Sequence, residues 1–293
     1  MQPPETIGAL AIQVLVHNAA AFEEHMPGAR AGEDPLHVHQ MRVATRRMRA
    51  ALRLFGDLLP AEASSLNDEL KWIAGQLGAA RDLDVQVRRL RETAAELGLT
   101  EAVVPYGAWL EQQRQRAQAE LVSAIESPRF EQLMQQLHQL QEWSPNPEVD
   151  APLFDNAPER LRGAYRQLRK RAKRIDKHAP ATDLHKVRIG AKRLRYAAEF
   201  FEVAYGKPAE RLAKLLVLLQ DRLGDLQDGV VSSEHIHQAV QTEASAWPAE
   251  TSMALGRVVQ RDVQVANQIR KGFPRLYREV RDQGWRRLRR SLN

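Results

Sequence analysis

Apolar residues along the chain recur mainly at three- and four-residue spacing, and no stretch shows the sustained alternation typical of a strand. We therefore predict an all-α protein, with prolines and glycines between the helices. The predicted helices of the first half cover residues 4–24, 36–59, 60–77, 82–97, 100–125 and 128–143. Those of the second half cover residues 158–175, 184–205, 208–223, 228–246, 248–271 and 274–291.

One segment of the first half returns in the second half at a constant distance of 146 positions. The recurring residues are His39, Arg42, Arg46, Arg47, Arg49 and Phe55, which correspond to His185, Arg188, Lys192, Arg193, Arg195 and Phe201. A fixed offset indicates an internal duplication. We expect two pseudo-symmetric helical bundles, over residues 1–143 and 158–293, that flank a basic groove or pore. A proline-rich linker over residues 144–157 joins them.

The repeated segment combines two chemically different helix faces. At about 100° per residue, the first copy gathers its basic side chains within an arc of roughly 80°. We call this stripe the first ridge; it contains His39, Arg42, Arg46, Arg49 and Arg53. The second ridge contains His185, Arg188, Lys192 and Arg195. Val38, Val43, Met48, Leu52 and Phe55 form the opposite face of the first copy and are expected to pack in a core.

Like charges at these helical spacings repel one another by about 0.2–0.5 kcal/mol per pair. Such a ridge is consistent with a polyanionic ligand, and equally with a solvated face that pairs with acids on other helices. The duplication with a histidine at the head of each ridge favours the ligand. Each histidine is interpreted as a donor to phosphate, or else as a cap or a core residue.

The net charge of +6 is unevenly distributed. Residues 1–150 hold 14 Lys and Arg against 21 Asp and Glu, a net of −7, and residues 151–293 hold 29 against 16, a net of +13. Such a field attracts anionic ligands. In the predicted helix 158–175, Arg162, Arg166, Arg169 and Lys173 share one face, with Lys170 and Lys177 at its margin. We expect this face to join the second ridge.

Several motifs have spacings or contexts that bear on a metal or a catalytic role. Gly78 is interpreted as a helix C-cap, and Asp82 as the N-cap of the next helix or as a partner for a ridge arginine. The pairs His37/His39 and His235/His237 have a spacing that places their side chains on different helix faces, so no metal site is expected. The chain has no cysteine and no phosphate-loop, zinc-protease or hydrolase signature, so we expect no cofactor and no enzyme.

Three motifs together resemble one family, the CHAD (conserved histidine α-helical) domain. They are the segment from His39 to Phe55, its copy from His185 to Phe201, and LGAARDLDV at residues 77–85. The resemblance covers nearly the whole chain and implies two helical bundles around a basic groove or pore that binds inorganic polyphosphate. Many members also carry a triphosphate tunnel domain, of which this sequence shows no ExExK motif. It is therefore similar to a stand-alone copy. Gln227 stands where the first half has Arg81, which departs from strict two-fold equivalence.

The sequence thus predicts a non-catalytic polyphosphate-binding protein. The binding residues are expected to be both ridges together with Arg166, Lys170, Lys173 and Arg193. The alternative is a nucleic-acid-binding module that uses the same surface, and a third class, a metal-dependent enzyme acting on polyphosphate, is less favoured. No apolar run approaches the roughly 20 residues that span a bilayer. We expect a cytoplasmic protein, with polyphosphate granules as one place of action and no membrane partner.

Overall fold

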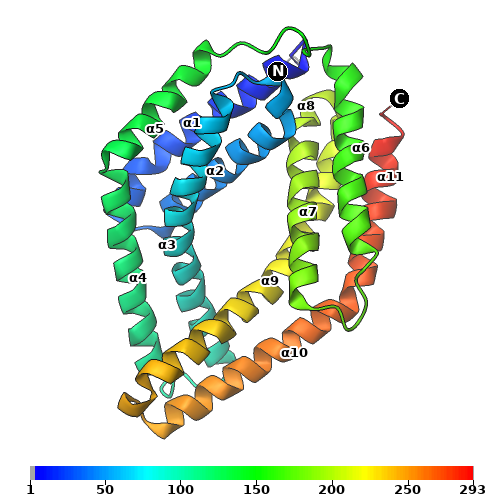
Figure 1. The fold of residues 1–293 in the computed structure, drawn as a ribbon. Coiled ribbons are helices and arrows are strands. Elements are labelled where there is room, and N and C mark those ends of the chain that lie inside the picture. The colour runs from blue at the N-terminus through cyan, green and yellow to red at the C-terminus, as the bar shows by residue number, and fades with distance from the viewer. Residues whose placement is uncertain (1–3, 293) are drawn as a thin grey trace.

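The structure, a computed structural model, describes residues 4–292, and its regular elements there are helices apart from one isolated bridge between Thr6 and Pro152. The all-α prediction is confirmed (Figure 1). The helices of the first half are α1 (Ile7–Ala31), α2 (Pro35–Phe55), η1 (Gly56–Leu58), α3 (Ala63–Leu97), α4 (Val104–Ile125), α5 (Pro128–His138) and η2 (Gln139–Glu142). Those of the second half are α6 (Leu153–Ala172), α7 (Ala181–Phe200), α8 (Glu202–Tyr205), α9 (Lys207–Glu243), η3 (Ala244–Ala246), α10 (Ala249–Glu279), the π-helical η4 (Val280–Trp285) and α11 (Arg286–Arg289).

Several local signals behave as the sequence indicates. Ser127 caps the N-terminus of α5, where its hydroxyl accepts a hydrogen bond from the Phe130 N–H. Gly98 ends α3 with φ +67, a left-handed conformation that favours glycine. The predicted apolar face of α2 is buried at Val38, Met48, Leu52 and Phe55, while Val43 is half-buried.

Five predicted helix boundaries are wrong, and in each case packing continues the helix. α1 continues through Pro27 to Ala31 rather than ending at residue 24, and Ala29 in this extension is buried. Gly78 and Gly224 lie inside α3 and α9, because buried leucines before and after each glycine keep the helix against the core. Likewise, α10 continues through Pro274 between the buried Phe273 and Val280. α6 begins at Leu153 rather than at residue 158, since Leu153 and Ala157 are buried ahead of Pro158. The proposed cap at Asp82 is likewise wrong, since Asp82 is in mid-helix.

The helices of the two halves follow the 146-residue offset. Ile7 and Leu153 begin α1 and α6, and Leu97 and Glu243 end α3 and α9. At the start of α1 and α6 the halves exchange a reciprocal pair of hydrogen bonds. The Ile7 N–H donates to the Ala151 oxygen at 3.0 Å, and the Leu153 N–H donates to the Glu5 oxygen at 3.1 Å.

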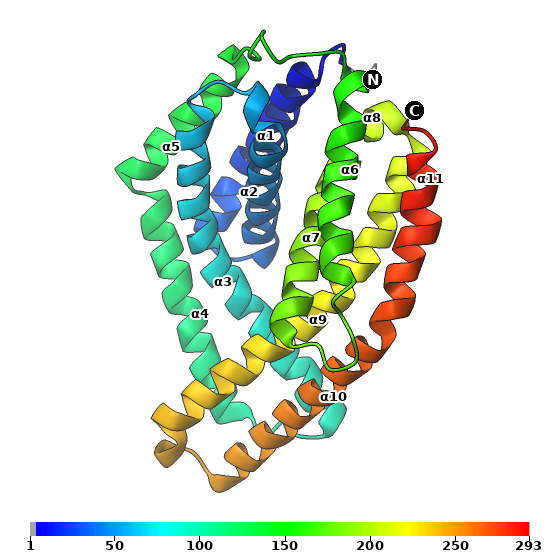
Figure 2. The same ribbon diagram turned by 45° about the vertical axis from the view of Figure 1, so that its right-hand side comes forward.

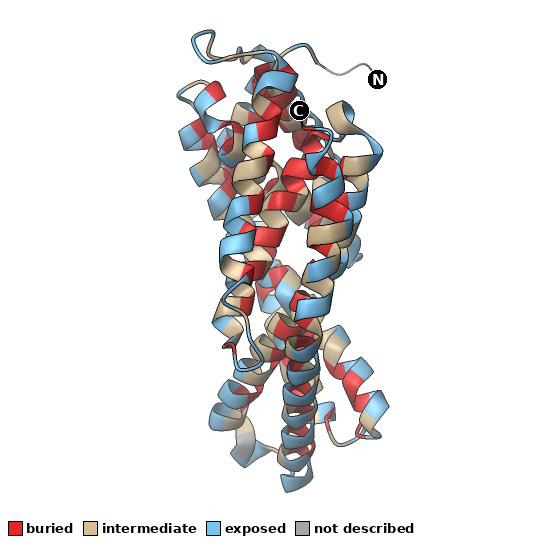
Figure 3. Ribbon diagram, turned by 90° about the vertical axis from the view of Figure 1, so that its right-hand side faces the viewer, coloured by how far each residue is buried: buried red, intermediate tan, exposed pale blue. Residues whose placement is uncertain are grey.

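The two halves lie side by side and meet at both ends of the molecule (Figures 1 and 2). At one end, α1 contacts α6 and α2 contacts α7, and the rings of Phe55 and Phe201 meet edge to face at 5.7 Å. At the other end, α3 and α4 contact α9 and α10 through a second apolar cluster around Tyr106 and Leu255. Buried positions follow the helix faces turned toward neighbouring helices (Figure 3). The ridges on α2 and α7 therefore lie between these two junctions.

Candidate functional site

Three cavities meet at the middle of the molecule, and Arg46 of α2 and Lys192 of α7 line all three. These two residues are equivalent under the 146-residue offset. We call the cavities the central cavity, with a volume of about 400 Å³, the α9 cavity and the α6 cavity. The duplicated ridge thus places one cation from each half at the junction.

The central cavity brings both ridges together. It is lined by His39, Arg42, Arg46, Arg81, Asp82, Val85, Gln86, His185, Arg188, Lys192, Gln227, Asp228 and Val231. These residues come from the four helices α2, α3, α7 and α9, so each half contributes one ridge helix and one long helix. The predicted residues His39, Arg42, Arg46, His185, Arg188 and Lys192 converge here.

The remaining ridge residues line the two flanking cavities. Arg195 lines the α9 cavity together with the carboxylates of Asp221 and Asp225. Arg49, Arg53 and Arg193 line the α6 cavity. The ridges therefore extend the cationic lining from one cavity to the next.

Two mid-helix glycines make room for the ridge arginines. A Cβ at Gly78 would lie 3.4 Å from Nη1 of Arg42, and a Cβ at Gly224 would lie 3.3 Å from Nη2 of Arg188. The two glycines are separated by the same 146 positions as the arginines. Their role is to let a guanidinium approach the backbone of α3 or α9, which a C-cap interpretation from sequence missed.

The cations at the junction lack protein partners. Within residues 4–292, neither Arg46 nor Arg188 nor Lys192 makes an ion pair or a side-chain hydrogen bond, and the buried Nε atoms of Arg46 and Arg188 are unsatisfied. Buried, unpaired donors are costly in a folded protein. An arrangement that retains several of them is suited to a ligand that supplies the missing acceptors.

Burial and mutual repulsion shift the titration of this cluster. Burial, together with the neighbouring positive charges of Arg188 and Arg46, lowers the pKa of Lys192 to about 7. The pKa values of Arg46 and Arg188 are lowered as well, chiefly by burial. His39 has a lowered pKa because it is half-buried and lies near the positive charges of Arg81 and Arg46. Positive charge is therefore concentrated where solvent compensates it poorly.

Other groups around the cavities are fixed by protein contacts. Arg42 lies 3.4 Å from Asp82, which confirms that this carboxylate can hold a ridge arginine. Nδ1 of His185 lies 2.9 Å from Oε1 of Gln227, the residue that replaces Arg81 in the second half. Burial raises the pKa of Asp228, which Arg188 opposes. The carboxylates thus border the cavities and orient part of their lining.

The structure corrects the prediction for α6. Arg166, Lys170 and Lys173 are exposed and line none of the three cavities, and Arg166 pairs with Glu159 at 2.6 Å. The side of α6 that faces the ridges carries Arg160 and Gln167 instead. The buried residues of α6 form a stripe along the helix, with the basic face on one side of it and the cavity-lining face on the other. The basic face therefore points away from the cavities.

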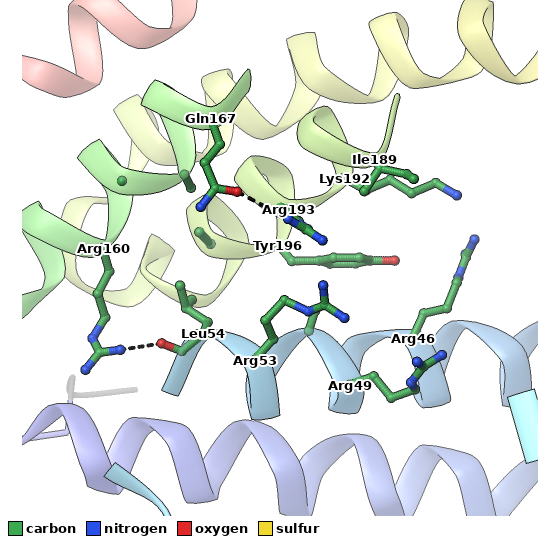
Figure 4. Close-up of a pocket in the computed structure, with 14 residues that line it drawn as sticks. Arg46, Arg49, Arg53, Leu54, Arg160, Gln167, Ile189, Lys192, Arg193 and Tyr196 are labelled. Atoms are coloured by element: carbon green, nitrogen blue, oxygen red, sulfur yellow. Dashed lines mark hydrogen bonds between the residues drawn. The ribbon is translucent and has the colours of Figure 1, made fainter. Parts of the chain in front are cut away.

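The α6 cavity contains residues that sequence reasoning did not assign to the site (Figure 4). Arg160 donates to the Leu54 oxygen and to both carboxylate oxygens of Asp57, so its charge is already paired. The ring of Tyr196 lies between the side chains of Arg53 and Arg193. Arg193 donates to Oε1 of Gln167 at 3.2 Å. The offset alone identifies Tyr196 only as the counterpart of Ala50, which gives no sign of this role.

Arg47 belongs to the repeated segment but makes a structural contact. It forms an ion pair with Glu199 and lies over the rings of Tyr196 and Phe200. Glu199 also lies 3.5 Å from Arg195. This network joins α2 to α7 beside the cavities.

Among the described residues, no group of three or more His, Asp or Glu side chains is placed to hold a metal ion. None of the helices described has both the length and the apolar character that crossing a membrane requires.

Comparisons with known proteins agree on the fold. The CHAD domain family model matches residues 13–237. The uncharacterized proteins MT2285 and Rv2226 of Mycobacterium tuberculosis are each 32% identical over 260 residues, covering 83% of this chain and 48% of the relative. The chain thus spans about half the length of the curated relatives it matches.

Two solved structures have the same architecture. The crystal structure of the CHAD domain from the plant Ricinus communis has a TM-score of 0.75 and 26% identity, and the match covers 93% of each chain. PptA from Streptomyces chartreusis has a TM-score of 0.73 and 20% identity, with 94% of this chain and 100% of that chain covered.

Proposed function

Because the chain belongs to the CHAD domain family, we propose that it binds inorganic polyphosphate in the three cavities that meet at Arg46 and Lys192, without chemical turnover. The observation that carries the proposal is the set of half-buried cations without protein partners at that junction. Polyphosphate supplies what they lack, since each phosphate unit carries about one negative charge and several acceptor oxygens.

The chemistry of the lining matches that ligand. A guanidinium presents its donors in a fork that fits two phosphate oxygens, and Arg46 and Arg188 hold such forks on rigid helices. Lys192 adds a compact charge near both arginines. A flexible anionic polymer can follow these cations from one cavity to the next and relieve their mutual repulsion. Release of counterions condensed on the polymer then makes binding strongly dependent on salt.

The site assignment is tested with two triple variants that each remove three basic side chains. Arg46→Ala, Arg188→Ala and Lys192→Ala remove the junction cations, whereas Arg166→Ala, Lys170→Ala and Lys173→Ala remove three exposed cations of α6. Affinity for long-chain polyphosphate is measured by calorimetry at about 0.15 M salt. Since a hydrogen bond to a charged group contributes about 1.5–3 kcal/mol, the junction variant is expected to lose at least a hundredfold. Equal losses in both variants would refute the assignment.

The absence of turnover has a separate test. The protein is incubated with polyphosphate and Mg²⁺, and orthophosphate release is followed with and without EDTA. We expect no release above the protein-free control. Release that EDTA abolishes would assign the protein to the metal-dependent enzymes.

The exposed basic face of α6 is the one observation that favours nucleic-acid binding. Arg166, Lys170 and Lys173 lie on an outer helix surface that a duplex can reach without entering the cavities. The same two triple variants distinguish polyphosphate binding from nucleic-acid binding, because duplex binding is expected to weaken in the α6 variant. If duplex DNA bound more tightly than polyphosphate and competed with it, the nucleic-acid reading would replace the proposal.

A further inference from the structure

The α6 cavity differs chemically from the other two cavities. Its lining includes the aliphatic side chains of Ala50 and Leu54 from α2, Ile189 and Ala197 from α7, and Ala164 from α6. The described lining of the α9 cavity has only charged and amide side chains and a glycine. Inorganic polyphosphate has no apolar part, so this aliphatic wall contributes nothing to binding it.

Two cations of the α6 cavity flank an aromatic ring. Arg53 and Arg193 lie on either side of the Tyr196 ring, and Arg46 and Arg49 lie farther along α2 (Figure 4). Within the described chain, Arg49 and Arg53 have no ion pair or hydrogen bond, and Arg193 contacts only the neutral amide of Gln167. The cavity therefore offers an apolar surface, flat guanidinium groups and unneutralised charge within one volume of about 490 Å³.

From this combination we infer that the α6 cavity binds the nucleoside of a nucleoside 5′-polyphosphate, while the phosphates extend to Arg46 and Lys192. A nucleobase is flat, so it packs against the aliphatic wall and stacks on guanidinium planes at Arg53 or Arg193. Its ring nitrogens and exocyclic groups accept and donate hydrogen bonds. A fatty chain uses only the aliphatic wall and desolvates the two arginines without compensation.

The phosphate end of this inference rests on the proposed function, because both ligands use Arg46 and Lys192. A nucleotide and a polyphosphate chain cannot both occupy Arg46 and Lys192 at the same time. A nucleotide and a polyphosphate chain are therefore mutually exclusive ligands, and the nucleotide level sets the fraction of protein open to the polymer.

The test compares ATP with inorganic tripolyphosphate, which has the same three phosphates but no nucleoside. Both titrations are run in EDTA so that divalent cations do not bind the ligands. The wild-type protein is expected to bind ATP about tenfold more tightly, from the known contribution of stacking a base on a flat side chain. Equal affinities would overturn the nucleoside site and leave polyphosphate binding intact.

The location is tested by filling the cavity from α6. Gly163 lines it, and a Cβ there meets only Nη2 of Arg166 at 3.9 Å, so Gly163→Leu extends a side chain without a backbone clash. Gly256→Leu in α10 is the matched control, because nothing lies within 4 Å of its Cβ position. Thermal melts establish that both variants are folded. We expect Gly163→Leu alone to abolish the preference for ATP, so that ATP and tripolyphosphate then bind this variant with equal affinity.

The outcomes distinguish this inference from the proposed function. An ATP preference that survives Gly163→Leu would overturn the location. An ATP preference lost in Gly163→Leu, in a protein that does not bind polyphosphate, would keep the nucleotide site and reject the proposed function. Competition between ATP and long-chain polyphosphate, relieved in Gly163→Leu, supports both.

Discussion

Polyphosphate binding should be accompanied by proton uptake at Lys192. In the free protein, burial and the neighbouring Arg188 and Arg46 hold the pKa of Lys192 at about 7. A bound polyanion replaces this environment with negative charge and moves the pKa toward the ordinary lysine value of about 10.4. The bound form then carries more protons than the free form throughout the interval between these values, so affinity falls as pH rises through it.

The size of the effect follows from the two pKa values. At pH 8 the free Lys192 is about one-tenth protonated and the bound Lys192 almost fully, so binding takes up about 0.9 proton. Affinity is expected to fall about tenfold from pH 6 to pH 8 and about tenfold again by pH 9. In the absence of ligand, pH has the opposite effect on folding stability. The unfolded chain binds the extra proton, so this group's contribution to stability increases as pH rises from about 7 to 10.

The assay is calorimetry at pH 8 in two buffers with different ionisation enthalpies, which counts the protons exchanged on binding. Lys192→Arg is the control, because it retains the charge and does not titrate in this range. Its proton uptake should be smaller than that of the wild-type protein by most of one proton. If the two proteins took up equal numbers of protons, the reasoning about the junction would be refuted.

Three further predictions concern stability. Arg46→Met removes a half-buried, unpaired cation and should raise the melting temperature without ligand by roughly 2 °C, while polyphosphate affinity falls; a lower melting temperature would contradict the repulsion argument. Arg89→Met leaves Asp262, which is 4% exposed, without its cation and should lower the free energy of unfolding in urea by about 3–5 kcal/mol. A loss below about 1 kcal/mol would mean that this pair does not secure the α3–α10 junction. Gly224→Ala should raise the free energy of unfolding by up to about 1 kcal/mol through helix propensity, and it should lower polyphosphate affinity severalfold by displacing Arg188. Thermal melts measure the first effect and calorimetry the second; an unchanged affinity would contradict the role of Gly224 in placing Arg188.

The sequence was sufficient for the helical class and for the ridge of α2. The face of α2 that buries Met48 and Phe55 is separated from the ridge by the geometry of the helix alone. The 146-residue offset then relates Arg46 to Lys192, and the structure brings both to one junction. Local periodicity and internal repetition determine these features, which is why no knowledge of neighbouring helices was needed.

Features that depend on contacts with neighbouring helices could not be predicted from the sequence. Gly78 has the local appearance of a helix end, and the approach of Arg42 from another helix explains why a glycine stands there in mid-helix. In α6, the basic side chains of Arg166 and Lys170 suggested the wrong side of the helix as the one that faces the ridges. One helix shows which face is apolar, but it does not show on which side of that face the next helix lies.

The reciprocal hydrogen bonds at Ile7 and Leu153 have the form of an isologous contact between two copies of one unit. In a homodimer every substitution appears twice, so its shared site is the same from either direction. Fusion into one chain removes that restriction, and the α6 cavity shows the result, because Tyr196 stands where the first half has Ala50. A linear polyphosphate has two identical ends and cannot distinguish the two directions through such a site. A ligand with a head and a tail can, and the difference between Ala50 and Tyr196 gives the α6 cavity two unlike sides for it.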